Sequence, residues 1–402
     1  MASLLLAIIY LAFISLGLPD TLLGAGWPTM YPDLNVPVSY AGIISMTIAF
    51  GTIVSALNSD RLTRRFGAGK VTAVSVAMTC AALFGFSVSH SFWMLVLWAI
   101  PYGLGAGGVD AALNNYVALH YSSRSMSWLH CMWGLGAAIS PYIMSFCLGR
   151  NLGWNSGYRF VSILQVVLTA ILFVSLPLWK TPEQALVNQN DGETASDPSK
   201  AAADSSSDSA KAMKISEILA IPGAKEVLFA FFCYCALEQT SMLWAASYLN
   251  LRLGMPAESA ASFGGMFCIG ITVGRAVNGF LTMKFSDDQL IRMGSAIIGI
   301  GALLIFVPFL PCALAGFILI GLGCAPVYPC IIHSTPANFG AERSQAIIGV
   351  QMAFAYIGIL VMPPLFGVIA SRISISLLPV YILAILALMV YLYESMLKKI
   401  GK

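Results

Sequence analysis

Long apolar segments separated by short polar breaks dominate the sequence. A helix needs about 20 apolar residues to cross the hydrocarbon core of a membrane. Twelve segments are of that order, near residues 4–30, 39–58, 71–89, 92–119, 125–148, 158–179, 224–250, 259–283, 289–308, 311–333, 344–370 and 375–397. Because they are continuous rather than alternating, a transmembrane β-barrel is not expected. Helices satisfy their backbone groups internally in lipid, so we predict an all-α protein with twelve transmembrane helices.

One polar stretch interrupts this pattern, at residues 181–222. It contains NQNDGETASDPSKAAADSSSDSAK, which is rich in Ser, Asp and Ala and cannot bury a core. It predicts two six-helix bundles, residues 1–180 and 223–402, joined by a linker. The end of the stretch, ISEILAIPG, is compatible with a short amphipathic helix on the membrane surface or with an ordered end of the linker.

The composition narrows the class of protein. Of the 402 residues, 58% are hydrophobic and 10% are charged, where a soluble domain carries about 25% charged residues. A soluble globular protein, a disordered chain and a nucleic-acid binder are therefore excluded. The net charge of +3 is too small to imply a polyanionic partner. The lipid bilayer is the partner that the composition demands.

Basic residues predict the orientation. Sixteen Lys and Arg lie in the tails, the linker and the loops on the side of the N-terminus, against four on the opposite side. Since cytoplasmic loops carry the excess of positive charge, both termini and the linker should be cytoplasmic, in a multi-pass protein of the inner membrane.

The two halves repeat one another at a nearly constant offset. LGLPD, ending at Asp20, corresponds to CALEQ around Glu238, and GLGAGGVD from Gly103 corresponds to GLGCAPVY from Gly321, both with an offset of 218 residues. These matches in the same order indicate a duplicated six-helix unit. The site would then lie between the two halves, near the middle of the membrane.

Three acids inside the spans are the first candidates for function: Asp20, Asp110 and Glu238. A carboxylate at the centre of a membrane costs about 2.5–3.5 kcal/mol on insertion scales. We expect these acids to line a polar cavity that binds substrate or protons, with Asp110 the best candidate for the proton carrier. The alternative is that neighbouring hydroxyl groups satisfy them and that they serve only packing.

Amides and aromatic rings near these acids suggest a sugar site. Amides and carboxylates match arrays of hydroxyl groups, and aromatic faces pack against a sugar ring. The candidate residues are Asp20, Trp27, Asn114, Asn115, Trp133, Glu238, Gln239, Trp244, Tyr328 and Gln351. For each Trp, anchoring at the interface or packing in the bundle is an equally good explanation. His130 is a possible proton partner or a hydrogen-bonded core residue, and Pro329 and His333 are expected to end a span.

The loop NSDRLTRRFGAGK resembles the signature loop of the major facilitator superfamily between the second and third helices. Asp60, Arg61, Arg64, Arg65 and Gly67 fill much of that motif. An acid and several guanidinium groups here can lock one half against the other on the cytoplasmic side. Arg275 is the candidate for the second half of this gate. Positive-inside topology alone is the alternative explanation.

Three segments resemble fucose permease, a member of that superfamily. They are ISLGLPDTLLG in the first span, GLGAGGVDAALNNYV in the fourth and HCMWGLGAAISP in the fifth. The resemblance implies the major facilitator fold, contact of Asp20 with substrate or proton, and proton transport by Asp110.

We therefore predict a monomeric transporter that moves a small polar solute, a monosaccharide first of all, by alternating access with proton symport. A proton-coupled exporter of drugs or metabolites and a non-transporting membrane sensor are the alternatives. The sequence has no HExxH or CxxC motif and no nucleophile–base constellation. We expect no catalytic residues, no metal site and no cofactor.

Overall fold

A computed structural model describes residues 2–121, 123–190 and 215–402, and these residues form helices, turns and loops without a strand. The helices of the first half are α1 (Ala2–Asp20), α2 (Leu22–Asp33), η1 (Val38–Tyr40), α3 (Ala41–Phe66), α4 (Ala68–Ser87), α5 (Phe92–His120), α6 (Ser123–Gly149) and α7 (Trp154–Asn190). Those that follow are α9 (Ile215–Ala220), α10 (Ala224–Leu253), α11 (Ala257–Gly264), α12 (Met266–Leu281), α13 (Asp287–Leu304), α14 (Leu310–Phe339), α15 (Ala341–Ile369), η2 (Ala370–Ser374), η3 (Ile375–Leu377) and α16 (Leu378–Lys399).

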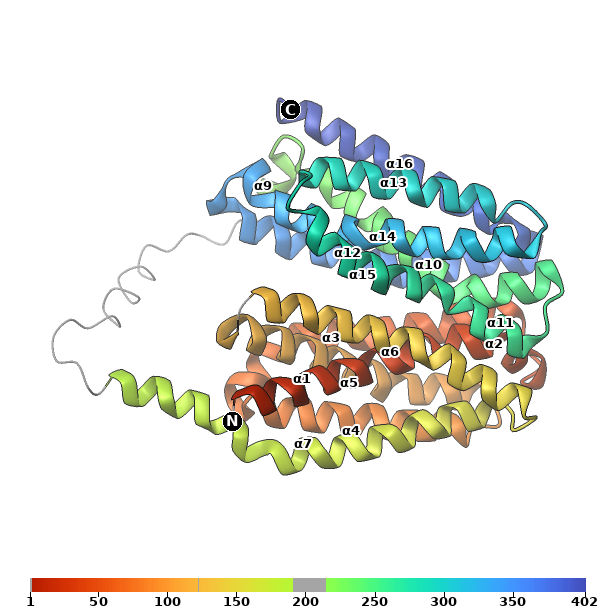
Figure 1. Ribbon diagram of the computed structural model, residues 1–402, viewed down its shortest axis with the longest axis horizontal. Coiled ribbons are helices and arrows are strands. Elements are labelled where there is room, and N and C mark those ends of the chain that lie inside the picture. The colour runs from red at the N-terminus through yellow and green to blue at the C-terminus, as the bar shows by residue number, and fades with distance from the viewer. Residues whose placement is uncertain (1, 122, 191–214) are drawn as a thin grey trace.

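The long helices lie side by side in two groups (Figure 1). Helices α1 to α7 form one group, and α10 and α12 to α16 form the other. Both chain ends, the end of α7 and helix α9 lie at one end of the molecule, which we call the terminal side. Helices α2 and α11 lie at the opposite end, which we call the far side.

Ten stretches of the described residues are long and apolar enough to cross a membrane. The predicted span at 289–308 corresponds to α13, which is not among the ten. The stretch Ile347–Lys399 contains most of α15 and all of α16. Large apolar side chains such as Phe50, Leu57 and Phe280 are more than 60% exposed on the outer surface. A surface of this kind requires lipid around it, so the chain is a multi-pass, all-helical membrane protein.

Several predicted boundaries were wrong. The first span is broken at Thr21 into α1 and α2, and the eighth is broken at Gly265 into α11 and α12. Helix α7 continues to Asn190, ten residues into the predicted linker. Helix α14 runs through Pro329 and His333 to Phe339, so these residues do not end the span. At the end of the linker, where a surface helix and an ordered end of the linker were both open, the structure has the short helix α9.

The internal repeat has a structural counterpart. A Cβ added at Gly103 of α5 would lie 2.2 Å from the Ile48 carbonyl oxygen of α3, and one at Gly321 of α14 would lie 2.0 Å from the Phe267 carbonyl oxygen of α12. Equivalent glycines therefore allow equivalent helix pairs to approach closely in each half. In lipid, where apolar surface between helices gains little, such backbone contacts hold helices together.

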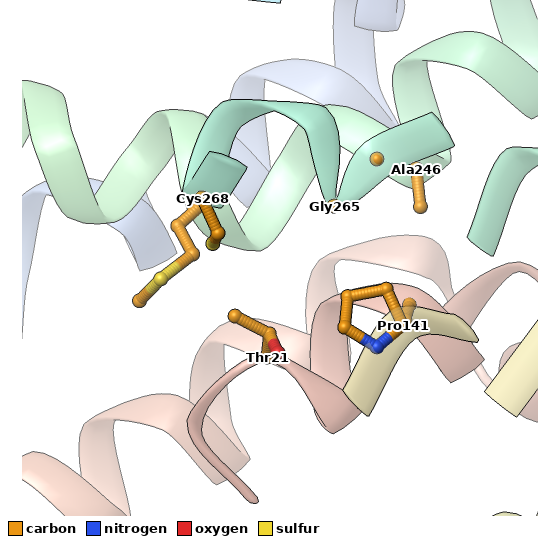
Figure 2. Close-up of a pocket in the computed structure, with 8 residues that line it drawn as sticks. Thr21, Pro141, Ala246, Gly265 and Cys268 are labelled. Atoms are coloured by element: carbon orange, nitrogen blue, oxygen red, sulfur yellow. The ribbon is translucent and has the colours of Figure 1, made fainter. Parts of the chain in front are cut away.

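The two halves contact each other closely on the far side. A Cβ at Gly24 of α2 would lie 2.8 Å from the Leu243 carbonyl oxygen of α10. One at Gly42 of α3 would lie 2.7 Å from the Cα of Pro364 in α15. Figure 2 shows Pro141 of the first half opposite Gly265 of the second, next to a cavity of about 10 Å³, room for about one water molecule. The far side is therefore tightly packed between the halves.

Candidate functional site

Asp20 lies where the first span changes from α1 to α2. Pro19 precedes it, and Thr21 follows as the residue between the two helices. The carboxylate accepts two hydrogen bonds from other helices of the same half. Tyr102 of α5 donates its hydroxyl to Oδ1 at 2.9 Å, and Trp133 of α6 donates its indole N–H to Oδ2 at 2.8 Å. Asp20 is thus held by its side chain at the break between two helices.

Trp133 also connects Asp20 to the second half of the molecule. The guanidinium carbon of Arg275, on α12, lies 5.1 Å from the centre of the indole ring. Nη2 of Arg275 lies 3.5 Å from Oε1 of Glu238, on α10. The Arg275 and Glu238 side chains are 19% and 15% exposed, so neither is fully excluded from solvent. We call Tyr102, Asp20, Trp133, Arg275 and Glu238 the central cluster.

The central cluster brings the two repeat-related acids together around one cation. Asp20 and Glu238 occupy equivalent positions in the halves, and the structure connects them through Trp133 and Arg275. Arg275 was expected in the cytoplasmic gate, but the structure places it here, between Glu238 and Trp133. An arginine over an indole face combines a cation–π contact with an ion pair, which suits a partly buried position between helices.

Asp110 lies close to the central cluster. Asn114, one turn later on α5, donates its amide to Oδ1 of Asp110 at 2.9 Å, as their i, i+4 spacing predicts. The Asp110 carboxylate also interacts electrostatically with Asp20 and with Tyr328 and Tyr356 of the second half. The predicted proton carrier and the predicted substrate acid therefore lie in one polar region.

Two predicted substrate residues make backbone contacts instead. Trp27 of the first half and Trp244 of the second are both fully buried. The indole of Trp27 donates to the Val38 carbonyl at 2.7 Å, and that of Trp244 donates to the Pro363 carbonyl at 3.0 Å. Since each N–H already has a backbone partner, the geometry favours packing for both residues, the alternative considered for each Trp.

The other predicted substrate residues have mixed surroundings. Gln351 is fully buried; its Oε1 accepts from Thr335 at 3.3 Å, and its Nε2 has no partner among the described residues. The Tyr328 hydroxyl points to the sulfur of Met352 at 3.4 Å. Gln239 is half-buried. The Asn115 side chain lies outside the described part of the structure, so its predicted role stays a prediction.

The predicted cytoplasmic gate lies at the end of α3, on the terminal side. Arg61 and Arg65 are exposed, and the guanidinium carbon of Arg65 lies 5.3 Å from the Phe66 ring. Gly67 has φ of 83°, a backbone conformation that side chains rarely adopt, which explains a glycine between α3 and α4. The side chains of Asp60 and Arg64 lie outside the described part, so the lock between the halves stays a prediction.

Sequence reasoning missed Tyr102 and the cross-half position of Arg275. Tyr102 lies in an apolar run, where a tyrosine has little contrast with its neighbours. A useful signal was available for Tyr102: it precedes Asp110 by eight residues, about two helical turns, and so lies on a similar face of α5.

His130, the possible proton partner, packs edge-on against Phe13 with ring centres 5.9 Å apart.

The charge balance of this region is negative. Among the side chains that the structure describes here, and with all groups ionised, Asp20, Asp110 and Glu238 carry three negative charges against one positive charge on Arg275. Two carboxylates are thus in excess in a partly buried place, where opposite charge or protons must compensate them. The region is suited to bind protons, hydroxyl groups or a cation, and poorly suited to an anion.

The chain matches one family model over most of its length and several known proteins at low identity. A family model described as Major Facilitator Superfamily matches residues 9–363. "Bypass of stop codon protein 6" of Saccharomyces cerevisiae is 24% identical over 286 residues, which cover 69% of this chain and 56% of the yeast protein. The chain thus matches little more than half the length of that relative.

Two bacterial relatives match over more of their own length. "Uncharacterized transporter y4wD" of Sinorhizobium fredii is 22% identical over 383 residues, 92% of each chain. "4-hydroxybenzoate transporter PcaK" of Pseudomonas aeruginosa is 22% identical over 307 residues, 71% of this chain and 67% of the relative. Among solved structures, a bacterial homologue of the human lysosomal transporter Spinster, inward-facing and occupied, superposes with a TM-score of 0.72 at 13% identity, covering 99% of this chain and 96% of that one.

Proposed function

Because this chain belongs to the Major Facilitator Superfamily and is a secondary transporter of that type, we propose that it moves a small uncharged polar solute together with protons. The observation that carries this proposal is the central cluster, in which Trp133 and Arg275 join an acid of one half to the equivalent acid of the other. A solute that binds there would contact both halves at once. Its binding energy would then depend on how the halves are arranged, which is what alternating access requires.

We propose a monosaccharide as the first solute to test. Carboxylates of the cluster can accept hydrogen bonds from hydroxyl groups, and the Trp133 ring offers an aromatic face. The excess of two carboxylates argues against an organic acid, although one relative is named as a 4-hydroxybenzoate transporter. The resemblance of the first, fourth and fifth spans to the fucose permease family is the sequence feature behind this choice of a monosaccharide.

Proton coupling would use the carboxylates that lack a cation. Asp110 is bonded to the neutral Asn114 amide, whereas Glu238 lies beside Arg275. Asp110 can therefore gain and lose a proton without breaking an ion pair, and we assign it the coupling role. The second candidate function, a proton-coupled exporter, is favoured by the same acid excess if the solute is an organic cation.

The topology completes the proposal. We propose twelve crossings in two six-helix bundles, with α13 crossing despite its charged first turn and with α15 and α16 crossing separately. Both termini would be cytoplasmic, in the inner membrane, with Asp60, Arg61, Arg64 and Arg65 forming a lock on that side. The far-side packing then corresponds to a conformation closed towards the outside, similar to the orientation named for the Spinster homologue.

A ligand screen tests this proposal directly. Purified protein is heated with neutral monosaccharides, with aromatic acids and with organic cations, because a ligand that binds only the folded state raises its melting temperature. We expect stabilisation by a neutral sugar and its loss in Asp20→Asn. Trp128→Phe, at an exposed position of α6, should keep the effect. Stabilisation by 4-hydroxybenzoate alone would contradict the charge argument, and stabilisation by organic cations alone would favour the exporter.

A further inference from the structure

Trp133 uses two different surfaces for two different partners. The edge of its indole donates to Asp20 at 2.8 Å, while its face lies under the Arg275 guanidinium with the guanidinium carbon 5.1 Å from the ring centre. These partners belong to different halves. The ring is half-buried on α6, so it is held in place without being sealed off. Trp133 therefore contacts both Asp20 of one half and Arg275 of the other.

The ion pair on the other side of Arg275 is loose. Its Nη2 to Oε1 distance to Glu238 is 3.5 Å, where a charge-assisted hydrogen bond is about 2.7–2.9 Å. The guanidinium is thus shared between the Glu238 carboxylate and the Trp133 ring. A cation–π contact is worth about 0.5–2 kcal/mol. That is enough to compete with a long ion pair, so small changes at Glu238 can move Arg275 over the ring.

The backbone around this contact is closely packed. A Cβ at Gly134, next to Trp133, would lie 2.6 Å from Oγ1 of Thr272, which is one turn before Arg275 on α12. The two helices therefore meet where Trp133 and Arg275 stack. A movement of the guanidinium therefore changes its contact with the Trp133 ring, which lies on the neighbouring helix.

We propose that Trp133 is a positioning residue that transmits the charge state of Glu238, in one half, to Asp20, in the other. When Glu238 is neutral, Arg275 has no anionic partner on α10. The guanidinium is then attracted more strongly to the Trp133 ring and to the Asp20 carboxylate on the other side of that ring. The halves are then drawn together at α6 and α12. When Glu238 is charged, Arg275 is held by α10 and the contact weakens. This role rests on the proposed function, because it concerns the coupling of protons to movement of the halves.

Other titratable groups face the same region and must be distinguished from Glu238. Interactions with Asp20, Glu238 or Arg275 involve Tyr102 and Asp110 on α5, His130 and Cys131 on α6, Tyr234 and Cys235 on α10, Cys268 on α12, and Cys324 and Tyr328 on α14. Among them, His130 lies three residues before Trp133 and interacts with Arg275. His130→Gln is therefore the essential comparison.

The test uses protons as the only probe. Tryptophan emission of the full chain in nanodiscs is recorded from about pH 4 to 8, the range in which carboxyl and imidazole groups titrate. The spectrum of the matching Trp133→Phe variant is subtracted to isolate Trp133. We expect a pH-dependent change of the Trp133 signal that is lost in Glu238→Gln and in Asp20→Asn, and kept in His130→Gln. Arg275→Lys, which keeps the charge but loses the planar stack, should reduce it.

Each other outcome overturns the proposal. A signal kept in Glu238→Gln but lost in Asp20→Asn would mean that Trp133 reports only its own hydrogen bond. A signal lost in His130→Gln but kept in Glu238→Gln would assign the change to the histidine. Trp128→Phe, at a position 49% exposed on the same helix, is the matched control: subtracting its spectrum isolates Trp128, and that difference should lack the pH response expected of Trp133. Since no solute is present, failure here is distinct from failure of the proposed function in the ligand screen.

Discussion

Gly24→Ala should open the far side of the molecule. Gly24 lies on α2, and its added Cβ would be 2.8 Å from the Leu243 carbonyl oxygen of the other half, 0.6 Å short of the 3.4 Å at which ordinary contact begins. The neighbour is backbone and cannot rotate away, so the halves must move apart locally. Overpacking of this kind costs about 1–3 kcal/mol. At about 1.4 kcal/mol for each factor of ten, the far-side-closed population should fall by roughly 5- to 150-fold.

Hydrogen–deuterium exchange of the protein in nanodiscs measures this shift. In Gly24→Ala we expect faster exchange in far-side residues 34–40, and slower exchange in terminal-side residues 61–70 as that side closes. Gly42→Ala should have the same effect, since its Cβ would meet Pro364 at 2.7 Å. Gly349→Ala is the control, because nothing lies within 4 Å of its added Cβ.

Two results would refute this reasoning. If Gly24→Ala exchanges like the wild type, the far-side contact is not a packed closure between the halves. If exchange rises equally at both ends, the substitution has loosened the fold instead of shifting its conformation. Alanine by itself is about 0.5–1 kcal/mol better than glycine within a helix, so Gly349→Ala should not lose stability.

Two further predictions concern the terminal side. Asp60→Asn should weaken the proposed lock, so that exchange in residues 61–70 becomes faster and uptake falls while solute binding remains; unchanged exchange would leave positive-inside topology as the only role of this loop. Replacing residues 191–210 by the same number of Gly and Ser residues should leave uptake within about twofold, because the sequence predicts a polar linker here that acts only as a tether. Loss of uptake with normal membrane insertion would contradict the tether.

The apolar runs predicted where helices lie but not where they end. Helix α7 passes Lys180 because residues such as Glu183, Gln184 and Ala185 are good helix formers that do not need lipid. The criterion of apolar length could not detect this continuation. Helix α14 contains Pro326, Pro329 and Pro336, which a rule for soluble helices would treat as ends. In a membrane bundle, neighbouring helices can satisfy the freed backbone groups.

The site was predictable where charge contrasts with its surroundings. Asp20, Asp110 and Glu238 stand out in apolar runs, and the structure places all three in one region. The tryptophans could not be separated in this way, since which indole meets Asp20 depends on how α1 packs against α6. Trp133 donates to that carboxylate, whereas Trp27 and Trp244 donate to backbone carbonyls. The role of Arg275 depends in the same way on the contact of α6 with α12.

Proton-coupled transport through Asp110 is the central claim, and one comparison tests it most directly. Wild type and Asp110→Asn are reconstituted in proteoliposomes with the solute that stabilises the protein best in the ligand screen. Asn keeps the size of Asp and one acceptor oxygen for the Asn114 amide, but it cannot exchange a proton. We expect Asp110→Asn to lose uphill accumulation driven by a pH gradient while it still exchanges labelled for unlabelled solute. Uphill accumulation by Asp110→Asn at the wild-type level would contradict the account.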